Sequence, residues 1–134
     1  MALIAVVNDD TAFIELMADL LSEEGYDTIV HKVGDTAYDL IRERMPNLVV
    51  LDIRMQNPDS GWIVLDLMRL DPQTTDIPVI ICSADVRFLH DKQQQLTDKG
   101  CCVLEKPFRL DELLTLVAHV LDPVTVGCEA VPSV

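Results

Sequence analysis

Short apolar runs recur five times along the chain, and each has the length of a single β-strand. The runs cover residues 3–7, 28–33, 48–51, 78–82 and 101–104. Most of them are rich in Val and Ile, which is typical of strands that a parallel sheet buries on both faces. The pattern therefore predicts five buried strands.

A segment with helical periodicity follows each of these runs. The first carries Phe13, Met17, Leu20 and Leu21 on one stripe and stops at Gly25, and the others cover residues 35–44, 62–70, about 86–99 and 110–121. Apolar side chains three or four residues apart indicate helices that pack one face against a sheet. The fourth segment is polar and rich in Gln, so we expect a weakly anchored surface helix there.

The alternation of strand and helix favours an α/β fold, in which helices cover both faces of a parallel sheet. We expect a flavodoxin-like, doubly wound sheet of five strands in the order 2-1-3-4-5, with five helices. In this topology the ligand crevice lies at the carboxyl ends of strands 1 and 3. We assign residues 1–122 to this domain and residues 123–134 to a flexible tail or linker stub.

The charge balance narrows the classes of partner. The chain of 134 residues has 10 Lys and Arg against 23 Asp and Glu, which gives a formal net charge of −13. Direct binding to nucleic acid or to an anionic membrane is therefore disfavoured. No apolar run approaches the ~18 residues of a membrane-spanning helix and no signal peptide is recognisable, so we expect a cytoplasmic protein. We expect its cysteines to be reduced core residues, as is usual in that compartment: Cys82, Cys101, Cys102 and Cys128.

Polar side chains of complementary chemistry follow four of the five predicted strands. They are Asn8, Asp9 and Asp10 after strand 1, Asp52 after strand 3, Ser83 and Ala84 after strand 4, and Lys106 after strand 5. The expected topology brings all of them to one edge of the sheet. Carboxylates crowded there repel one another without a cation, and hard oxygen ligands with room for water suit Mg2+.

Asp52 has the chemistry of a phosphoacceptor. A carboxylate can attack phosphorus to give an acyl phosphate, provided that the negative charge of the reacting groups is balanced. Mg2+ and the Lys106 ammonium would balance it, while Ser83 hydrogen-bonds a phosphoryl oxygen and Ala84 leaves space for the donor. Taken singly, Asp10 also suits a helix cap, Ser83 a turn and Lys106 a solvated charge. Their combination at four strand ends favours the phosphoacceptor site.

Four segments together resemble the response-regulator receiver family, over residues 3 to about 121. They are AVVNDD at 5–10, LDIRM at 51–55, ICSA at 81–84 and LEKPF at 104–108. The resemblance implies that Asp52 takes phosphate from a histidine kinase, that Ser83 is the switch hydroxyl and that Lys106 pairs with the phosphate.

The resemblance also implies a magnesium site. Its direct ligands would be Asp9, Asp52 and the backbone carbonyl of Arg54, with support from Asp10 and, through water, from Asn8. Asn8 stands where the family usually has an acidic residue, so we expect weaker Mg2+ binding.

Two further departures from the family pattern bear on the switch. Val103 stands three residues before Lys106, where many members have an aromatic residue that moves with the switch hydroxyl. The loop from Arg54 to Ser60 lacks the usual Met-Pro order and is longer by one residue, which is expected to alter access for a phosphodonor.

The sequence thus predicts a signalling switch rather than an enzyme. We expect it to receive phosphate from a sensor histidine kinase or phosphotransfer protein and to bind a downstream protein target, as a monomer or weak homodimer. The alternative is a pseudo-receiver, which uses the same fold as an interaction module without phosphorylation, and Asn8 and Val103 favour it. A phosphatase is disfavoured because it needs an acid where Arg54 stands, and a flavodoxin because the loop after strand 1 is acidic.

Overall fold

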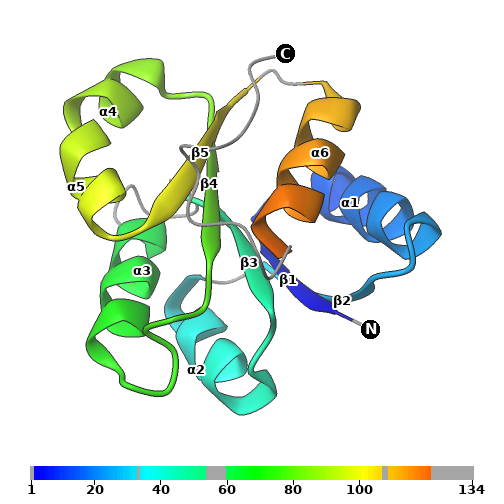
Figure 1. The fold of residues 1–134 in the computed structure, drawn as a ribbon, viewed down its shortest axis with the longest axis horizontal. Coiled ribbons are helices and arrows are strands. Elements are labelled where there is room, and N and C mark those ends of the chain that lie inside the picture. The colour runs from blue at the N-terminus through cyan, green and yellow to red at the C-terminus, as the bar shows by residue number, and fades with distance from the viewer. Residues whose placement is uncertain (1, 33, 54–59, 107–108, 122–134) are drawn as a thin grey trace.

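Five parallel strands and the helices between them make up the described part of the protein. The structure is a computed structural model that describes residues 2–32, 34–53, 60–106 and 109–121. The strands are β1 (Leu3–Val7), β2 (Asp27–His31), β3 (Leu48–Asp52), β4 (Val79–Ser83) and β5 (Cys101–Glu105). The helices are α1 (Thr11–Glu23), α2 (Gly34–Arg44), α3 (Ser60–Leu70), α4 (Val86–Asp91), α5 (Gln93–Asp98) and α6 (Leu110–Leu121), as Figure 1 shows.

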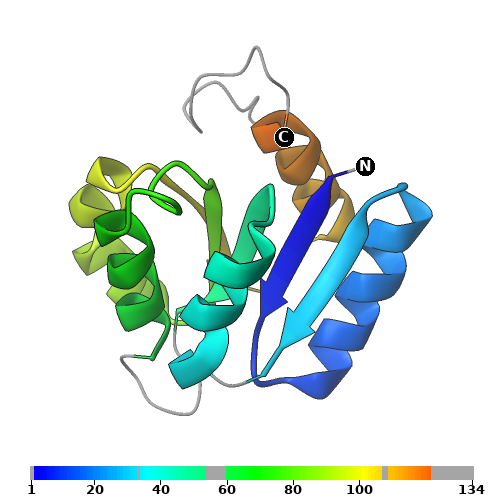
Figure 2. The same cartoon turned by 90° about the horizontal axis from the view of Figure 1, so that it is seen from below.

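The strands form one parallel sheet in the order β2-β1-β3-β4-β5, which confirms the predicted flavodoxin-like topology. Helices α1 and α6 cover one face of the sheet, and α2 to α5 cover the other (Figure 2). Two apolar cores result, because successive side chains of a strand point to opposite faces. Ile4 and Val6 pack toward α1 and α6, whereas Ala5 and Val7 pack on the other face.

The fourth predicted helix is divided in the structure, so the described residues form six helices rather than the five expected. The backbone at Lys92 has φ −101° and ψ 7°, which departs from helical geometry and separates α4 from α5. Hydrogen bonds of helical type continue on both sides, from the Lys92 N–H to the Phe88 carbonyl and from the Leu96 N–H to the Lys92 carbonyl. Leu89 and Leu96 pack into the core from these two helices, and the partly buried Phe88 packs against it.

A polar cluster ties α2 to the segment before β4. The Tyr38 hydroxyl donates to Asp71 Oδ2 at 2.6 Å, and Arg42 Nε lies 3.3 Å from the same oxygen. The backbone N–H of Gln73 donates to Asp71 Oδ1 at 2.9 Å. The hydrogen bond from Tyr38, followed by that from Gln73, lowers the pKa of Asp71 below its ordinary value, and the same contact with Asp71 raises the pKa of Tyr38.

The cysteines differ in state. Cys82 and Cys101 are buried free thiols, as expected. Cys102 takes part in a disulfide, so the expectation that it is reduced is wrong; that expectation came from the compartment and not from the position of this side chain. Cys128, like the predicted tail at 123–134, lies outside the described residues. Within the described ranges, no helix is long and apolar enough to cross a membrane.

Candidate functional site

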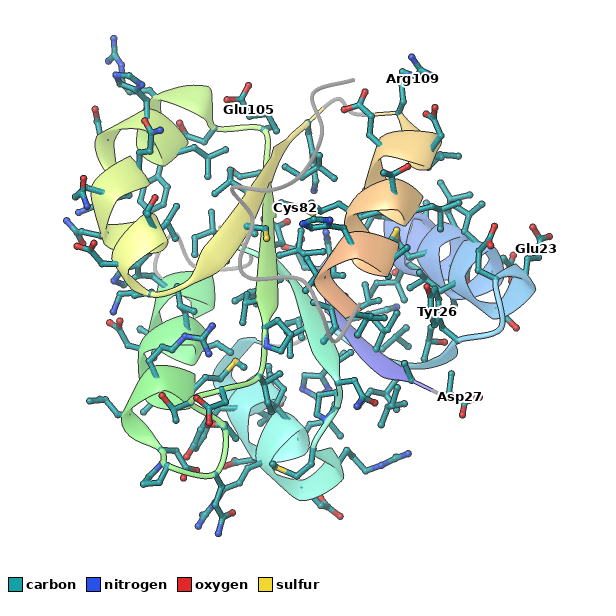
Figure 3. The ribbon with its side chains drawn as sticks, viewed as in Figure 1. Glu23, Tyr26, Asp27, Cys82, Glu105 and Arg109 are labelled. Carbon is teal, nitrogen blue, oxygen red and sulfur yellow. The ribbon has the colours of Figure 1, made fainter. Side chains whose placement is uncertain are left out.

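The carboxyl ends of the strands gather the predicted site residues along one edge of the sheet. Val7 of β1 pairs with Leu51 of β3, so Asn8 and Asp52, the next residues of the two segments, meet at that edge. Ser83 ends β4 in register with Glu105 of β5, which Figure 3 labels. A pocket of about 240 Å³ opens here, and its lining residues are Asp52, Ser83, Ala84, Asp85 and Lys106. The structure therefore brings the predicted phosphoacceptor, switch and phosphate-binding residues to one cavity.

Lys106 makes three contacts, one through its backbone and two through its side chain. Its backbone N–H donates to the Ser83 carbonyl at 2.9 Å, which ties the end of β5 to the end of β4. Its Nζ lies 3.6 Å from Asp52 Oδ2 and 4.7 Å from the centre of the Phe13 ring. Asp52 is 8% exposed, so the ion pair joins a mostly buried carboxylate to a partly exposed ammonium, and both residues line the pocket.

Ser83 is 2% exposed and already accepts one hydrogen bond, from the Asp85 N–H to Oγ at 3.0 Å. A hydroxyl that accepts through its oxygen keeps its own hydrogen as a donor. Asp85 in turn caps α4, because its Oδ1 accepts from the Phe88 N–H at 3.0 Å. The Ser83 hydroxyl is thus connected to the start of α4 through one residue.

The three polar residues after β1 have different environments. Asn8 is 1% exposed, and its Oδ1 accepts from the Asp10 N–H at 2.9 Å. Its Nδ2 is buried and has no hydrogen-bond partner within the described part of the chain. Asp9 is exposed, whereas Asp10 caps α1 by accepting from the N–H groups of Ala12 and Phe13 at 3.0 and 3.3 Å. The helix-cap interpretation of Asp10 therefore describes its contacts here.

The donor chemistry of this edge fits a magnesium ion. Two carboxylates, Asp9 and Asp52, come from the ends of neighbouring strands, and Mg2+ is commonly bound by one or two carboxylates together with waters. No group of three or more His, Cys, Asp or Glu side chains suited to a metal occurs among the described residues. The third predicted ligand, the Arg54 carbonyl, lies outside those residues, as does most of the Arg54–Ser60 loop.

Sequence reasoning missed three residues of the site. Phe13 touches Lys106, and Asp85 lines the pocket. Gly61 packs so closely on the end of β3 that a Cβ there would lie 2.4 Å from the Asp52 carbonyl oxygen. Asp85 could have been found from its place two residues after Ser83, ahead of a helix. The other two depend on contacts between distant segments, which a single sequence does not display.

Val103, by contrast, stands outside the pocket. It is 39% exposed on β5 and lines a different hollow, of about 630 Å³, between α4, α5, β5 and the start of α6. The position three residues before Lys106 therefore carries a small exposed side chain in this protein.

Comparison with known proteins places these residues in a family. Residues 4–118 match the model of the response regulator receiver domain. The chain is 31% identical over 118 residues to the DNA-binding dual master transcriptional regulator RpaA of Synechocystis, covering 88% of this chain and 48% of RpaA. It is 28% identical over 119 residues to the polar-differentiation response regulator DivK of Brucella ovis, covering 88% of this chain and 94% of DivK.

A solved structure agrees with this at the level of the fold. The receiver domain of the sensor histidine kinase PA1611 from Pseudomonas aeruginosa, with a magnesium ion coordinated in the active site cleft, superposes with a TM-score of 0.77. The match has 20% identity and covers 90% of this chain and 97% of that domain. The chain spans about half the length of RpaA but nearly all of DivK. With a match over most of its length, the chain belongs to the response regulator receiver domain family of two-component signalling.

Proposed function

We propose that this protein is a phosphoacceptor switch of a two-component phosphorelay, in which Asp52 takes phosphate from a sensor histidine kinase or a phosphotransfer protein. The observation that carries the proposal is the single pocket that Asp52 shares with Ser83 and Lys106, with the Lys106 ammonium 3.6 Å from Asp52 Oδ2. A nucleophile, a hydrogen-bond donor and a cation beside one small cavity are the groups that phosphoryl transfer to a carboxylate requires.

The transfer forms one bond and breaks another. An Asp52 carboxylate oxygen attacks phosphorus, the bond from phosphorus to the donor's leaving atom breaks, and an acyl phosphate remains on Asp52. The Lys106 ammonium balances part of the charge on the phosphoryl oxygens, and the open side at Ala84 admits the donor. Asp9 and Asp52, with the Arg54 carbonyl, would hold Mg2+, which supplies further charge neutralisation when bound. The magnesium ion in the PA1611 receiver domain supports this assignment by analogy.

The output of the switch begins at Ser83. Its hydroxyl hydrogen is available to a phosphoryl oxygen, while its oxygen holds the Asp85 N–H that precedes α4. A hydrogen bond from the Ser83 hydroxyl to the phosphoryl group would favour one of two arrangements of β4 and α4. A ligand shifts such an equilibrium only as far as it binds one arrangement more tightly than the other. Coupling of this kind is typically ~1–3 kcal/mol. We assign the switch to residues 1–122, in the cytoplasm, acting on a downstream protein as a monomer or weak homodimer.

One observation favours the pseudo-receiver alternative. Asn8 is a buried neutral amide at the metal edge, with one amide nitrogen that has no partner among the described residues. An amide in place of an acid removes one negative charge from the cation site and weakens its hold on Mg2+. If Mg2+ does not bind at cellular concentration, the same fold would act as an interaction module.

Intact mass after incubation with acetyl phosphate separates the two functions. We expect wild type to gain one phosphoryl group in millimolar Mg2+ and none in chelator. Asp52→Asn should gain none, while Asp19→Asn, which changes an exposed aspartate on α1, should behave as wild type. Absence of the gain in wild type with Mg2+ would favour the pseudo-receiver, and a gain that survives in Asp52→Asn would move the phosphoacceptor elsewhere.

A further inference from the structure

The Lys106 ammonium has a neighbour that the chemistry above does not use. We propose that Phe13, on the first turn of α1, is a positioning residue that holds Lys106 Nζ beside Asp52 through a cation–π contact. This inference deepens the proposed phosphoacceptor function and rests on it for its consequence in phosphorylation. The contact itself is a property of the unphosphorylated protein and is tested separately.

Two distances place the ammonium between an anion and a ring. Nζ lies 3.6 Å from Asp52 Oδ2, beyond the usual range of an N–H···O hydrogen bond, so the pair is an ion pair at longer contact. The same atom lies 4.7 Å from the centre of the Phe13 ring, inside the ~6 Å within which a cation is attracted to an aromatic face. The ring therefore supports Nζ at a second point.

The position of the ring is fixed by the start of α1. Asp10 caps that helix and accepts from the Phe13 N–H at 3.3 Å, so the backbone of Phe13 is bound to the loop that follows β1. The Phe13 side chain is half-buried and packs against the core between the sheet, α1 and α6. Figure 2 shows that α1 begins beside the ends of β1 and β2. The residues that line the pocket follow the carboxyl ends of β3, β4 and β5, at the same edge of the sheet.

Lysine needs such support more than most residues do. Its side chain is long and flexible, and holding it in one geometry costs rotamer entropy. The Lys106 side chain is 25% exposed, and an ion pair in contact with solvent is weak by itself. Contact with the ring keeps Nζ close to Asp52, where the phosphoryl oxygens would lie after transfer. Loss of the ring should therefore leave the Lys106 ammonium present but less often positioned beside Asp52.

The first test is the rate of phosphorylation by acetyl phosphate in saturating Mg2+. Phe13→Leu keeps an apolar side chain and removes the ring, whereas Phe13→Tyr keeps the ring. We expect Phe13→Leu to slow phosphorylation about two- to fivefold and Phe13→Tyr to restore a rate close to that of wild type, as the usual strength of a cation–π contact implies. Equal rates for wild type and Phe13→Leu, or an equal slowing in both variants, would overturn the inference.

The second test needs no phosphate. A double-variant cycle of Phe13→Leu and Lys106→Met, read from urea unfolding, measures whether the ring and the ammonium interact. We expect Phe13→Leu to change the unfolding constant about two- to fivefold more in the presence of Lys106 than in the Lys106→Met background. Additive effects would refute the contact. If wild type is not phosphorylated at all, the phosphoacceptor proposal fails, while a positive cycle still establishes that Phe13 holds Lys106.

Discussion

The close packing of Gly61 on β3 makes Gly61→Ala a sharp test of how the site is built. A Cβ at this position would lie 2.4 Å from the Asp52 carbonyl oxygen and 2.5 Å from both the Cα and the carbonyl oxygen of Ile53. Side-chain Cβ atoms essentially never come within 3.0 Å of such atoms, so the backbone must separate by at least about 0.6 Å. All three neighbours are backbone atoms of the strand end that carries Asp52, so no side-chain rotation relieves the clash.

The sign of the effect distinguishes this packing from helix propensity. Gly61 lies in the first turn of α3, where Ala would be favoured over Gly by up to ~1 kcal/mol if only propensity mattered. Overpacking of a closed contact usually costs ~1–3 kcal/mol, so we expect a net loss of stability. We also expect slower phosphorylation at Asp52, because the displaced atoms belong to that residue and the next. Urea unfolding followed by circular dichroism measures the first effect, and mass after timed exposure to acetyl phosphate measures the second.

Gly25→Ala is the matched control. Gly25 follows α1 with φ +88° and has no atom within 4 Å of a built Cβ, so Ala there is strained by its backbone alone, remote from the pocket. We expect a loss of ~1 kcal/mol with unchanged phosphorylation. The reasoning on Gly61 would be refuted if Gly61→Ala were as stable as wild type, or if its phosphorylation fell no more than that of Gly25→Ala.

Two other predictions concern charge. Asn8→Asp should lower the stability measured in chelator by on the order of 3 kcal/mol, because it buries a carboxylate beside Asp52. The same substitution should lower the Mg2+ dissociation constant. Urea midpoints with and without Mg2+ measure the stability and calorimetric titration measures the dissociation constant, and an unchanged or raised dissociation constant would contradict the prediction. Asp71 has a lowered pKa in the folded protein, so its contribution to stability is present above the unfolded value of 3.8 and is lost as the pH falls through the folded pKa. Tyr38→Phe removes the chief cause of that shift, so the stability of the variant should fall less between about pH 6 and pH 2.5 than that of wild type, as measured by urea midpoints. Parallel curves for variant and wild type would exclude the Tyr38–Asp71 hydrogen bond as the cause of the pH dependence.

The sheet was predictable because burial leaves a strong record in the sequence. Strands β1, β3 and β4 are buried along nearly their whole length and are apolar almost throughout. The edge strands β2 and β5 are partly exposed, so the prediction that all five strands are buried is wrong for these two, because an edge strand has a neighbouring strand on one side only. Helix α6 was predicted with its observed bounds because one side carries apolar residues at helical spacing. The division at Lys92 was not predictable, since no proline or glycine marks it and the hydrogen bonds continue on both sides.

The site was predictable only as far as each strand end could be recognised. Asp52, Ser83 and Lys106 meet at one pocket as expected, because the parallel topology fixes where strand ends lie. Asp10 carried two interpretations, a helix cap and a support for the cation site, and the sequence could not choose between contacts that use the same carboxylate. The approach of Phe13 to Lys106 depends on how far α1 tilts and where a long side chain turns, and neither leaves a pattern in the sequence.

Cys82 gives strand β4 a natural chemical reporter. This thiol lies on β4 opposite Asp52 in the ladder, is fully buried on the side of the sheet that α1 and α6 cover, and is labelled in Figure 3. Burial, opposed in part by Lys106, raises its pKa to about 12, so the thiol is protonated in almost all molecules at pH 8. A thiol reagent can therefore react with Cys82 only when local opening exposes β4 to solvent. The labelling rate of Cys82 then reports how often β4 opens, the strand that carries Ser83 and lies beside the strand that carries Asp52.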